Sequence, residues 1–369
     1  MQNYDLDNFE PAAKIVVIGV GGAGNNAVNR MIDEEIANVD FWVANTDKQA
    51  LSTSKSLHRL ILGQEITGGL GAGGEPEIGE KAAEASVEDI KEIVKDANMV
   101  FVAAGMGGGT GTGAAPVVAR IARDAGALVV AIVTRPFTFE GKKRVVNSIS
   151  GLNKLRENVD AIIVVSNDKL LMTAGNSAIS SAFNESDKVL AQSVKTVVNL
   201  ILLPAVINLD FADVRNTLKD AGVSMIGFGV GSGPNRAKDA ANAALNSPLL
   251  EASISGARRA IVAVTCGPNV SLFDAQDTVN LLINASGHDV DVKFGVAIND
   301  QLNDEILVSV IASDFEEEFD FSKTNSYQAP ARPNIESPVL APITEEAPKE
   351  EDQDNIDVTS ILPGFLNKE

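Results

Sequence analysis

The chain has 369 residues, of which 45% are hydrophobic, and its formal net charge is −20 at pH 7. This composition is typical of a globular protein with room for two domains, and the negative charge disfavours nucleic acid as a partner because phosphate backbones would be repelled. A single cysteine excludes an internal disulfide framework and a multi-cysteine zinc site. Because the sequence has no signal-peptide pattern and no apolar run of membrane-spanning length, we expect a cytoplasmic protein without direct membrane insertion.

Short apolar runs rich in β-branched residues recur through the first half of the chain, with amphipathic helical stretches between them. They occupy residues 14–20, 40–47, 99–105, 127–135 and 160–167. This alternation predicts an α/β fold with a Rossmann-like, doubly wound parallel sheet. We therefore expect a flexible N-terminus over residues 1–12 and a nucleotide-binding domain over residues 13–176.

A long helical stretch and a second set of strands follow. Apolar residues at spacings of three, four and seven predict a central helix over residues 177–203, which ends before a proline. Strands are then predicted at 224–231, 259–267, 291–299 and 305–312. They indicate a second mixed α/β domain over residues 204–315.

The composition changes after this second domain. Residues 316–356 contain many acids and prolines with scattered apolar side chains, which predicts a disordered acidic linker. Residues 357–369 regain apolar side chains in "ILPGFL", which is typical of a short partner-binding peptide on a flexible tether. The alternative is a chance apolar end of a disordered tail.

Three glycine-rich clusters mark the first domain. Residues 19–24 have GxGxxG spacing after a strand, residues 67–79 read "TGGLGAGGEPEIG", and residues 103–116 read "AAGMGGGTGTGAAP". Because glycine inside regular elements costs roughly 0.5–1 kcal/mol relative to alanine, such clusters indicate backbone N–H groups turned towards an anion. The first cluster alone also fits an NAD-dependent dehydrogenase, whereas three loops could surround a chain of phosphates. The sequence has no GxxxxGK[ST] and no NKxD motif, which excludes Walker-type ATPases and Ras-like GTPases.

The third cluster contains GGGTGTG, the signature of the tubulin superfamily, and residues 14–315 resemble the FtsZ family of bacterial cell-division proteins. The match continues through "GVGGAGNNAVNRM", "NTD", "GLGAGG", "TRPFTFEGKKR" and "NLDFADVR". The resemblance implies a GTPase that binds GTP and GDP, polymerises head to tail into filaments and forms the division ring at mid-cell. It also implies Mg²⁺ held mainly by phosphates and water, and membrane-anchor and regulator proteins as partners of residues 357–369.

The resemblance implies roles for individual residues of the nucleotide site. The first loop would bind phosphate and nucleoside, the second would lie near the γ-phosphate, and the third would surround the phosphates; these candidates are Gly21, Gly22, Ala23, Gly24, Asn25, Asn26, Ala72, Gly73, Gly108, Gly109, Thr110, Gly111 and Thr112. Glu140 and Arg144 would contact the ribose side, and Asn167, Phe183 and Asp187 would hold guanine. From the residues alone, Phe183 fits a core position on an apolar helical stripe and Glu140 fits a solvated charge.

The glycine loops supply no base for hydrolysis, which directs attention to "NLDFADVR". Asp210 and Asp213 are three residues apart at an expected helix start and so share a face, with Asn208 just before them. Helix capping alone explains these acids equally well. The resemblance implies that the loop reaches the γ-phosphate of a neighbouring subunit and positions the attacking water there. A nucleotide-binding filament scaffold with little turnover remains an alternative, as does the dehydrogenase.

Overall fold

A computed structural model describes residues 13–174, 179–202, 205–247, 249–250, 254, 256–286, 290–316 and 319–322. For residues 172–174, 179–181 and 286 it describes the backbone alone. The predicted N-terminal segment 1–12, the C-terminal peptide 357–369 and nearly all of the predicted linker lie outside these residues. None of the described helices is long and apolar enough to cross a membrane.

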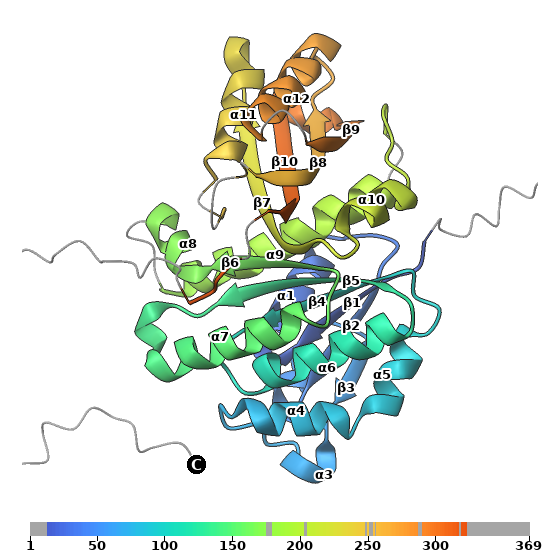
Figure 1. The fold of residues 1–369 in the computed structure, drawn as a ribbon, viewed down its shortest axis with the longest axis vertical. Coiled ribbons are helices and arrows are strands. Elements are labelled where there is room, and N and C mark those ends of the chain that lie inside the picture. The colour runs from blue at the N-terminus through green and yellow to red at the C-terminus, as the bar shows by residue number, and fades with distance from the viewer. Residues whose placement is uncertain are drawn as a thin grey trace, which may run out of the picture. The chain divides into compact units, whose positions relative to one another are not determined.

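The first part of the chain forms a parallel sheet, as predicted (Figure 1). Its strands pair in the order β3-β2-β1-β4-β5-β6, and their bounds are β1 Ile15–Val20, β2 Asp40–Asn45, β3 His58–Ile61, β4 Met99–Gly105, β5 Leu128–Arg135 and β6 Ala161–Ser166. Every residue of β1 is buried, because helices cover both faces of the sheet. The five predicted strands are confirmed, while the short β3 was not predicted.

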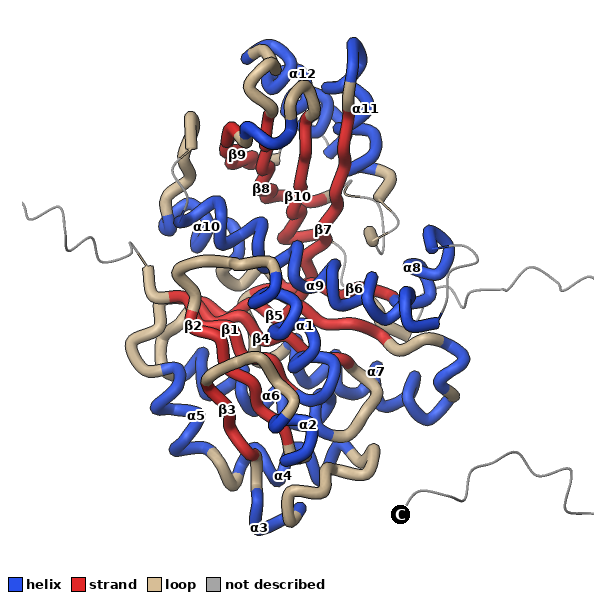
Figure 2. Tube along the Cα trace, turned by 180° about the vertical axis from the view of Figure 1, so that it is seen from behind, coloured by secondary structure: helices blue, strands red, loops and turns tan. Residues whose placement is uncertain are grey.

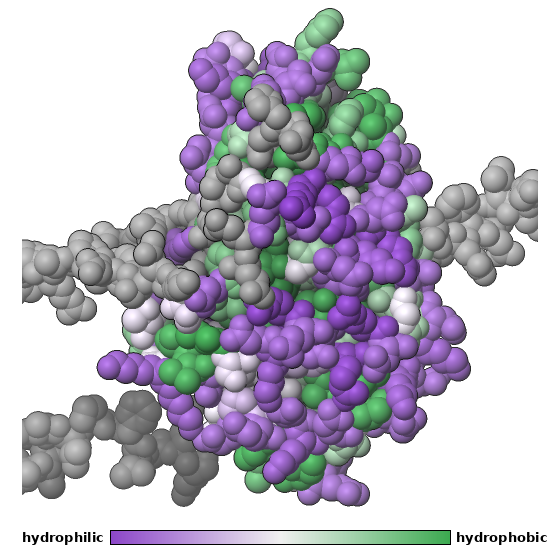
Figure 3. Space-filling model, in the orientation of Figure 1, coloured by the Kyte–Doolittle hydropathy of each residue, from purple (hydrophilic) through white to green (hydrophobic). Residues whose placement is uncertain are grey.

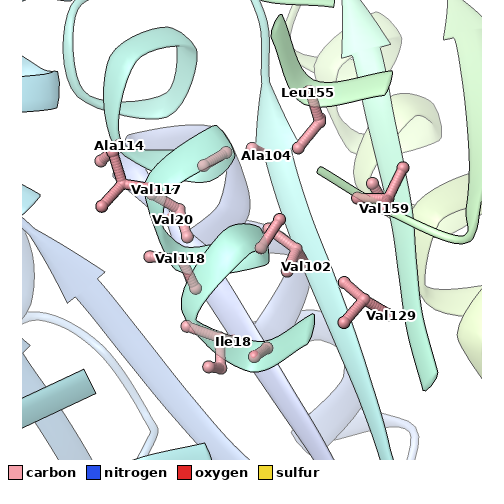
Figure 4. Packing of buried hydrophobic residues seen from close by; sticks show 14 of the residues in the cluster. Ile18, Val20, Val102, Ala104, Ala114, Val117, Val118, Val129, Leu155 and Val159 are labelled. Carbon is pink, nitrogen blue, oxygen red and sulfur yellow. The ribbon is translucent and has the colours of Figure 1, made fainter. Parts of the chain in front are cut away.

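Helices pack on both faces of this sheet. On one face lie α1 Gly21–Asp33, the 24-residue α9 Ile179–Leu202 and α10 Phe211–Leu218; on the other lie α4 Pro76–Glu84, α5 Val87–Val94, α6 Thr110–Asp124 and α7 Lys142–Arg156. Figure 4 shows the second face, where Val118 of α6 packs near Ile18 of β1 and Val102 of β4. The shorter helices are α2 Lys48–Ser52, α3 Gln64–Thr67 and α8 Asn167–Ala174. The predicted central helix is confirmed as α9.

The second part of the chain extends the same sheet. Strand β7 Gly222–Gly231 pairs in parallel with β6 through its first residues and then pairs antiparallel with β10 Ile306–Phe315. Beyond β10 follow β8 Ala257–Cys266 and β9 Asp291–Ile298, which gives a ten-stranded sheet. Helices α11 Arg236–Leu245 and α12 Leu272–Ser286 cover it with their own apolar core. The four strands predicted here are confirmed, and β7 joins the two parts.

The chain after β10 returns to the first sheet, which corrects the predicted start of the linker. Phe321 is 1% exposed and lies in the core that α6 and α7 cover. Arg156 of α7 donates a hydrogen bond to the Phe319 carbonyl oxygen at 3.2 Å, and its guanidinium lies 6.0 Å from the Phe321 ring centroid. The prediction of a linker from residue 316 was wrong because acidic neighbours hide these two apolar residues in the local composition. Ordered packing continues at least to Ser322.

Candidate nucleotide-binding site

The glycine-rich loops lie where the strand order of the parallel sheet reverses. From β1 the chain continues through α1 to β2, and from β4 it continues through α6 to β5 on the other side. Helices α1 and α6 therefore lie on opposite faces of the sheet, with their N-termini beside the carboxyl ends of β1 and β4 (Figures 1 and 2). Such a reversal point is the usual ligand crevice of an open α/β sheet.

Close backbone approaches bring the three loops together. A Cβ on Gly21 would lie 2.8 Å from the Gly111 nitrogen, which places the first loop against the third. A Cβ on Gly109 would lie 2.8 Å from the Ala72 Cβ, which places the third loop against the second. A Cβ on Gly24 would lie 2.2 Å from a carbonyl oxygen of β4. Larger side chains at these glycines would force the loops apart.

Gly22 and Gly108 are glycines for a different reason. Among the described glycines, only these two have neither a φ in the left-handed range nor any atom within 4 Å of the position that a Cβ would take. Gly73 also faces open space, but its φ of +59° itself favours glycine. Nothing in the chain's conformation or packing explains Gly22 and Gly108, so both fit a ligand that lies directly against the backbone.

The helix N-termini at this crevice carry no capping side chain. The residues that precede α1 and α6 are Val20 and Gly109, and neither helix has an acid in its first turn. By contrast, the Asp47 carboxylate caps α2 by accepting from two backbone N–H groups. The first N–H groups of α1 and α6 therefore remain available to an anion, which the helix dipole also favours.

Two predicted site residues hold the loops in shape. Asn25 is 3% exposed, and its amide nitrogen lies 2.9 Å from two carbonyl oxygens of the β1–α1 turn when it is oriented to donate to both. Thr112 is 2% exposed, and its hydroxyl accepts from the Gly107 N–H at 2.8 Å. Ala23 and Thr110 are half-buried, while Asn26 is exposed. Thr110 and Asn26 are thus the polar side chains among these residues that stay at least partly exposed.

Aromatic and charged side chains lie at the beginnings of α7 and α9. Phe183 is 42% exposed, and its ring meets that of Phe137 edge-on with centroids 5.1 Å apart. The core position that its helical stripe favoured is therefore wrong. Glu140 is no isolated surface charge, because it forms an ion pair with Arg144 and accepts from the Phe137 N–H at 2.9 Å. Phe137 was absent from the sequence candidates, although the matched segment "TRPFTFEGKKR" contains it.

The candidate base-binding residues lie close together. Asn167 begins α8 directly after β6, is 5% exposed, and its side-chain oxygen accepts from the Ser186 hydroxyl at 2.9 Å. Asp187 follows Ser186 on α9. Burial raises the pKa of its carboxyl to about 6, although the positive charge of Arg30 on α1 acts to lower it. The Asn167 side chain of α8 and the Asp187 carboxyl of α9 are thus linked to α9 and α1 by one hydrogen bond and one charge interaction.

The acidic loop lies far from these groups. Asn208 accepts from the Ala205 N–H at 2.7 Å, and the Asp210 carboxylate caps α10 by accepting from the Asp213 N–H at 2.8 Å. Both α8 and α10 appear in Figures 1 and 2 at opposite ends of α9. The 24 residues of α9 span about 36 Å at the usual helical rise. The structure therefore does not bring the acidic loop to the glycine loops of its own chain.

Two family models match the chain. The model of the tubulin/FtsZ family GTPase domain matches residues 14–175, and that of the FtsZ family C-terminal domain matches residues 222–316. The solved structure of an empty FtsZ dimer from M. jannaschii is 39% identical, has a TM-score of 0.81, and is matched over 88% of this chain and 95% of its own. The chain belongs to the FtsZ family.

Other solved structures agree with this assignment. A variant of M. jannaschii FtsZ is 41% identical with a TM-score of 0.79, matched over 82% of this chain and 92% of its own. A protofilament of CetZ2 from Haloferax volcanii with bound GTPγS is 23% identical with a TM-score of 0.71, matched over 84% and 95%, and shows the shared fold. Membership of the FtsZ family confirms the resemblance found in the sequence and excludes the dehydrogenase alternative, because the matched domain is a GTPase domain.

Proposed function

We propose that this FtsZ-family protein is a GTP-dependent polymerising GTPase whose head-to-tail filaments form the bacterial division ring. The observation that supports it best is the separation of the two halves of the site along α9. Because Asp210 and Asp213 cannot reach the glycine loops of their own chain, they would act on the nucleotide of the next subunit. Hydrolysis would then depend on assembly.

Each part of the nucleotide has candidate partners in the site. Backbone N–H groups around Gly22 and Gly108 would hold the phosphates, and Glu140 and Arg144 would lie beside the ribose. Phe183 offers an exposed ring for stacking. The Asp187 carboxylate can accept from the ring N–H and amino group of guanine, whereas adenine has no such ring N–H, so this residue favours GTP over ATP.

A magnesium ion bound to the nucleotide phosphates fits this arrangement. Within the described residues, no group of three or more His, Cys, Asp or Glu side chains lies close enough to hold a metal ion by itself. The loops present backbone N–H groups, which suit phosphate oxygens rather than cations. The ion would therefore be held mainly by phosphates and water, and it would neutralise charge during phosphoryl transfer.

Exposed apolar side chains support a head-to-tail contact. Leu70 in the second loop and Phe139 beside Phe137 are 89% and 62% exposed. In the second part of the chain, Val206, Phe273 and Ile298 are 63%, 78% and 58% exposed, and Figure 3 shows apolar groups over α12 and beside β9. Two different surfaces that meet form a heterologous contact, and such a contact produces open filaments when its rotation does not close into a ring. The dimer of M. jannaschii FtsZ and the CetZ2 protofilament support the same proposal.

The ring and its partners are inferred from the family. Filaments beneath the membrane at mid-cell would need attachment, and residues 357–369 would bind membrane-anchor and regulator proteins. Deleting residues 357–369 should therefore abolish partner binding while assembly and turnover continue.

Light scattering and phosphate release, followed together over a range of protein concentrations, test the proposal. We expect GTP-dependent scattering, with activity per subunit near zero in dilute solution and rising steeply above an assembly threshold. Activity proportional to protein concentration from the lowest measurable value would contradict catalysis between subunits. Assembly without phosphate release would favour the scaffold alternative.

A further inference from the structure

Thr46 lies at the junction between two of the glycine loops. It directly follows β2 and is 0% exposed. Its hydroxyl oxygen lies 2.7 Å from the hydroxyl oxygen of Thr110, at the start of α6. Its carbonyl oxygen accepts from the Gly71 N–H at 3.1 Å and from the Thr67 hydroxyl at 3.3 Å, so one residue contacts both the second and the third loop.

Burial determines which of the two hydroxyls donates. The hydrogen of a buried hydroxyl requires an acceptor, because leaving it unpaired is unfavourable. Within the described part of the chain, the hydrogen-bond partner found for the Thr46 hydroxyl is Thr110. Thr46 must therefore donate and Thr110 accept, which leaves the hydrogen of the half-buried Thr110 free to point elsewhere.

Thr110 lies beside the proposed phosphate position. Thr110 is the first residue of α6, whose N-terminus has no capping side chain, and it lies two residues after Gly108 with its open backbone. A hydroxyl that accepts a hydrogen bond also becomes a better donor, because chains of hydrogen bonds polarise one another. Thr46 thus fixes both the direction and the strength of the hydrogen bond that Thr110 can offer.

We propose that Thr46 is a positioning residue for phosphate binding that acts through the Thr110 hydroxyl. This inference rests on the proposed function, because it takes the ligand at the loops to be a guanine nucleotide. A merely structural role is the competing explanation, in which the pair stabilises the loops equally with and without nucleotide. The two explanations differ in whether loss of the Thr46 hydroxyl weakens nucleotide binding at all, and action through Thr110 further requires that this effect vanish when the Thr110 hydroxyl is absent.

A double-mutant cycle on equilibrium GTP and GDP binding separates the two explanations. Dilute protein is used so that assembly does not contribute. Thr46→Val removes the hydroxyl at nearly constant volume and should weaken binding about three- to tenfold, the range for one lost hydrogen bond. Adding it to Thr110→Val should weaken binding no further, because its target is already absent. Thr46→Ser, which keeps the hydroxyl, should stay within about twofold of the unaltered protein.

Thr278→Val is the matched control. Thr278 is also 0% exposed, and its hydroxyl donates to the Asp274 carbonyl oxygen at 2.8 Å within α12, in the second part of the chain. This variant loses the same chemical group at the same burial and should bind nucleotide normally. Thermal unfolding without nucleotide shows which variants are folded, and Thr46→Ala replaces Thr46→Val in the cycle if the valine variant is not.

Two results would overturn the inference. One is normal binding by the folded Thr46→Val or Thr46→Ala variant. The other is a double variant whose loss equals the product of the two single losses, since that would mean that Thr46 acts independently of Thr110. Absence of GTP binding by the unaltered protein would instead refute the proposed function, so the two failures are distinguishable.

Discussion

Helices α6 and α10 begin in opposite ways. Both have N-terminal N–H groups without partners inside the helix. Before α6 stands Gly109, with no capping side chain and no acid in the first turn. Before α10 stands Asp210, whose carboxylate accepts from the first turn, where Asp213 adds a second acid. One N-terminus is open to an external anion, and the other is already occupied by the chain's own carboxylate.

In the proposed function, this difference would divide the site into a binding half and a reacting half. The open N-terminus attracts phosphate, whereas the acidic loop repels it and can act only on water or cations at its edge. Because the two lie at opposite ends of α9, a head-to-tail contact is the arrangement that would bring them together. Each half can therefore be altered without the other.

The largest effect is expected from removing the acids. Asp213→Ala should lower phosphate release by about 10²- to 10⁴-fold through lost positioning of water, with GTP binding unchanged. Asp210→Ala should do the same but should also lose a helix cap worth about 1 kcal/mol. Asp210→Asn retains a side chain that can cap the helix but removes the negative charge, so it tests the effect of the charge separately. Phosphate release is measured well above the assembly threshold, with GTP binding measured in dilute protein.

Mixtures with unaltered protein provide the control. A subunit with Asp213→Ala retains its own nucleotide pocket but would spoil that of its neighbour, so a small fraction should depress activity beyond simple dilution. Two results would show that the acids serve their own chain. One is a mixture whose activity equals the weighted mean of the two proteins, and the other is a loss of GTP binding as large as the loss of turnover.

A substitution in the core beneath α6 should change the stability of the fold without altering either helix N-terminus. Phe321→Ala removes a ring that is 1% exposed and should lower the free energy of unfolding by about 3–5 kcal/mol, from lost burial and the cavity left behind. GTP affinity of the folded protein should change little, because neither N-terminus is altered. Denaturant unfolding measures the effect, with truncation after Ser322 as the control that keeps the ring. Unfolding unchanged by Phe321→Ala would contradict its place in the core.

Sequence patterns predicted the sheet well because its parallel strands are buried on both faces and so form continuous apolar runs. They missed β3 because its four residues are exposed or only half-buried, which breaks that signal. Phe321 was missed because composition averages over a window in which acids outnumber aromatics. For Phe183 the apolar stripe alone favoured a core position, whereas the resemblance implied a ligand contact, because a stripe of apolar residues does not show which of them remain exposed.

The site was predictable as a set of loops but not as a set of contacts. Glycine clusters showed that backbone must approach something closely, yet they could not separate Gly111, which packs against its own chain, from Gly108, which faces open space. The hydrogen bond between Thr46 and Thr110 joins residues 64 apart and leaves no spacing signal. Such distinctions depend on tertiary structure.

That distinction between glycines provides the next test of the open N-terminus. Gly108→Ala should leave stability unchanged but weaken GTP binding by on the order of 10- to 100-fold, the range for a hydrogen bond to a charged group. Gly111→Ala is the contrasting variant, because its Cβ would lie 2.5 Å from the Gly105 carbonyl oxygen and should destabilise the fold as well. Equilibrium binding and thermal unfolding are measured on both. Normal GTP binding by Gly108→Ala would mean that no ligand lies against this backbone.

The smallest expected effect is a dependence of GTP affinity on pH, through the proposed guanine-binding residue Asp187. Burial raises the pKa of Asp187 to about 6 in the nucleotide-free protein. The ionised carboxylate can accept both hydrogen bonds from guanine, whereas the protonated carboxyl replaces one acceptor with an O–H donor, so we expect GTP binding to favour loss of the proton. Affinity should be constant above about pH 7 and fall below pH 6, reaching about a tenfold loss at pH 5, one unit below the pKa. Equilibrium GTP binding in dilute protein from pH 5 to 8 measures this.

Stability of the nucleotide-free protein should change in the opposite direction over the same range. The folded pKa lies above the unfolded value of 3.8, so between about pH 4 and 6 the folded state binds more protons. As pH falls through this window, Asp187 therefore contributes increasing stability while GTP affinity decreases. Asp187→Asn should remove both trends, and titration of the nucleotide's own phosphates is common to both proteins and cancels in their comparison. Parallel pH profiles of the unaltered protein and Asp187→Asn would show that this carboxyl does not recognise the base.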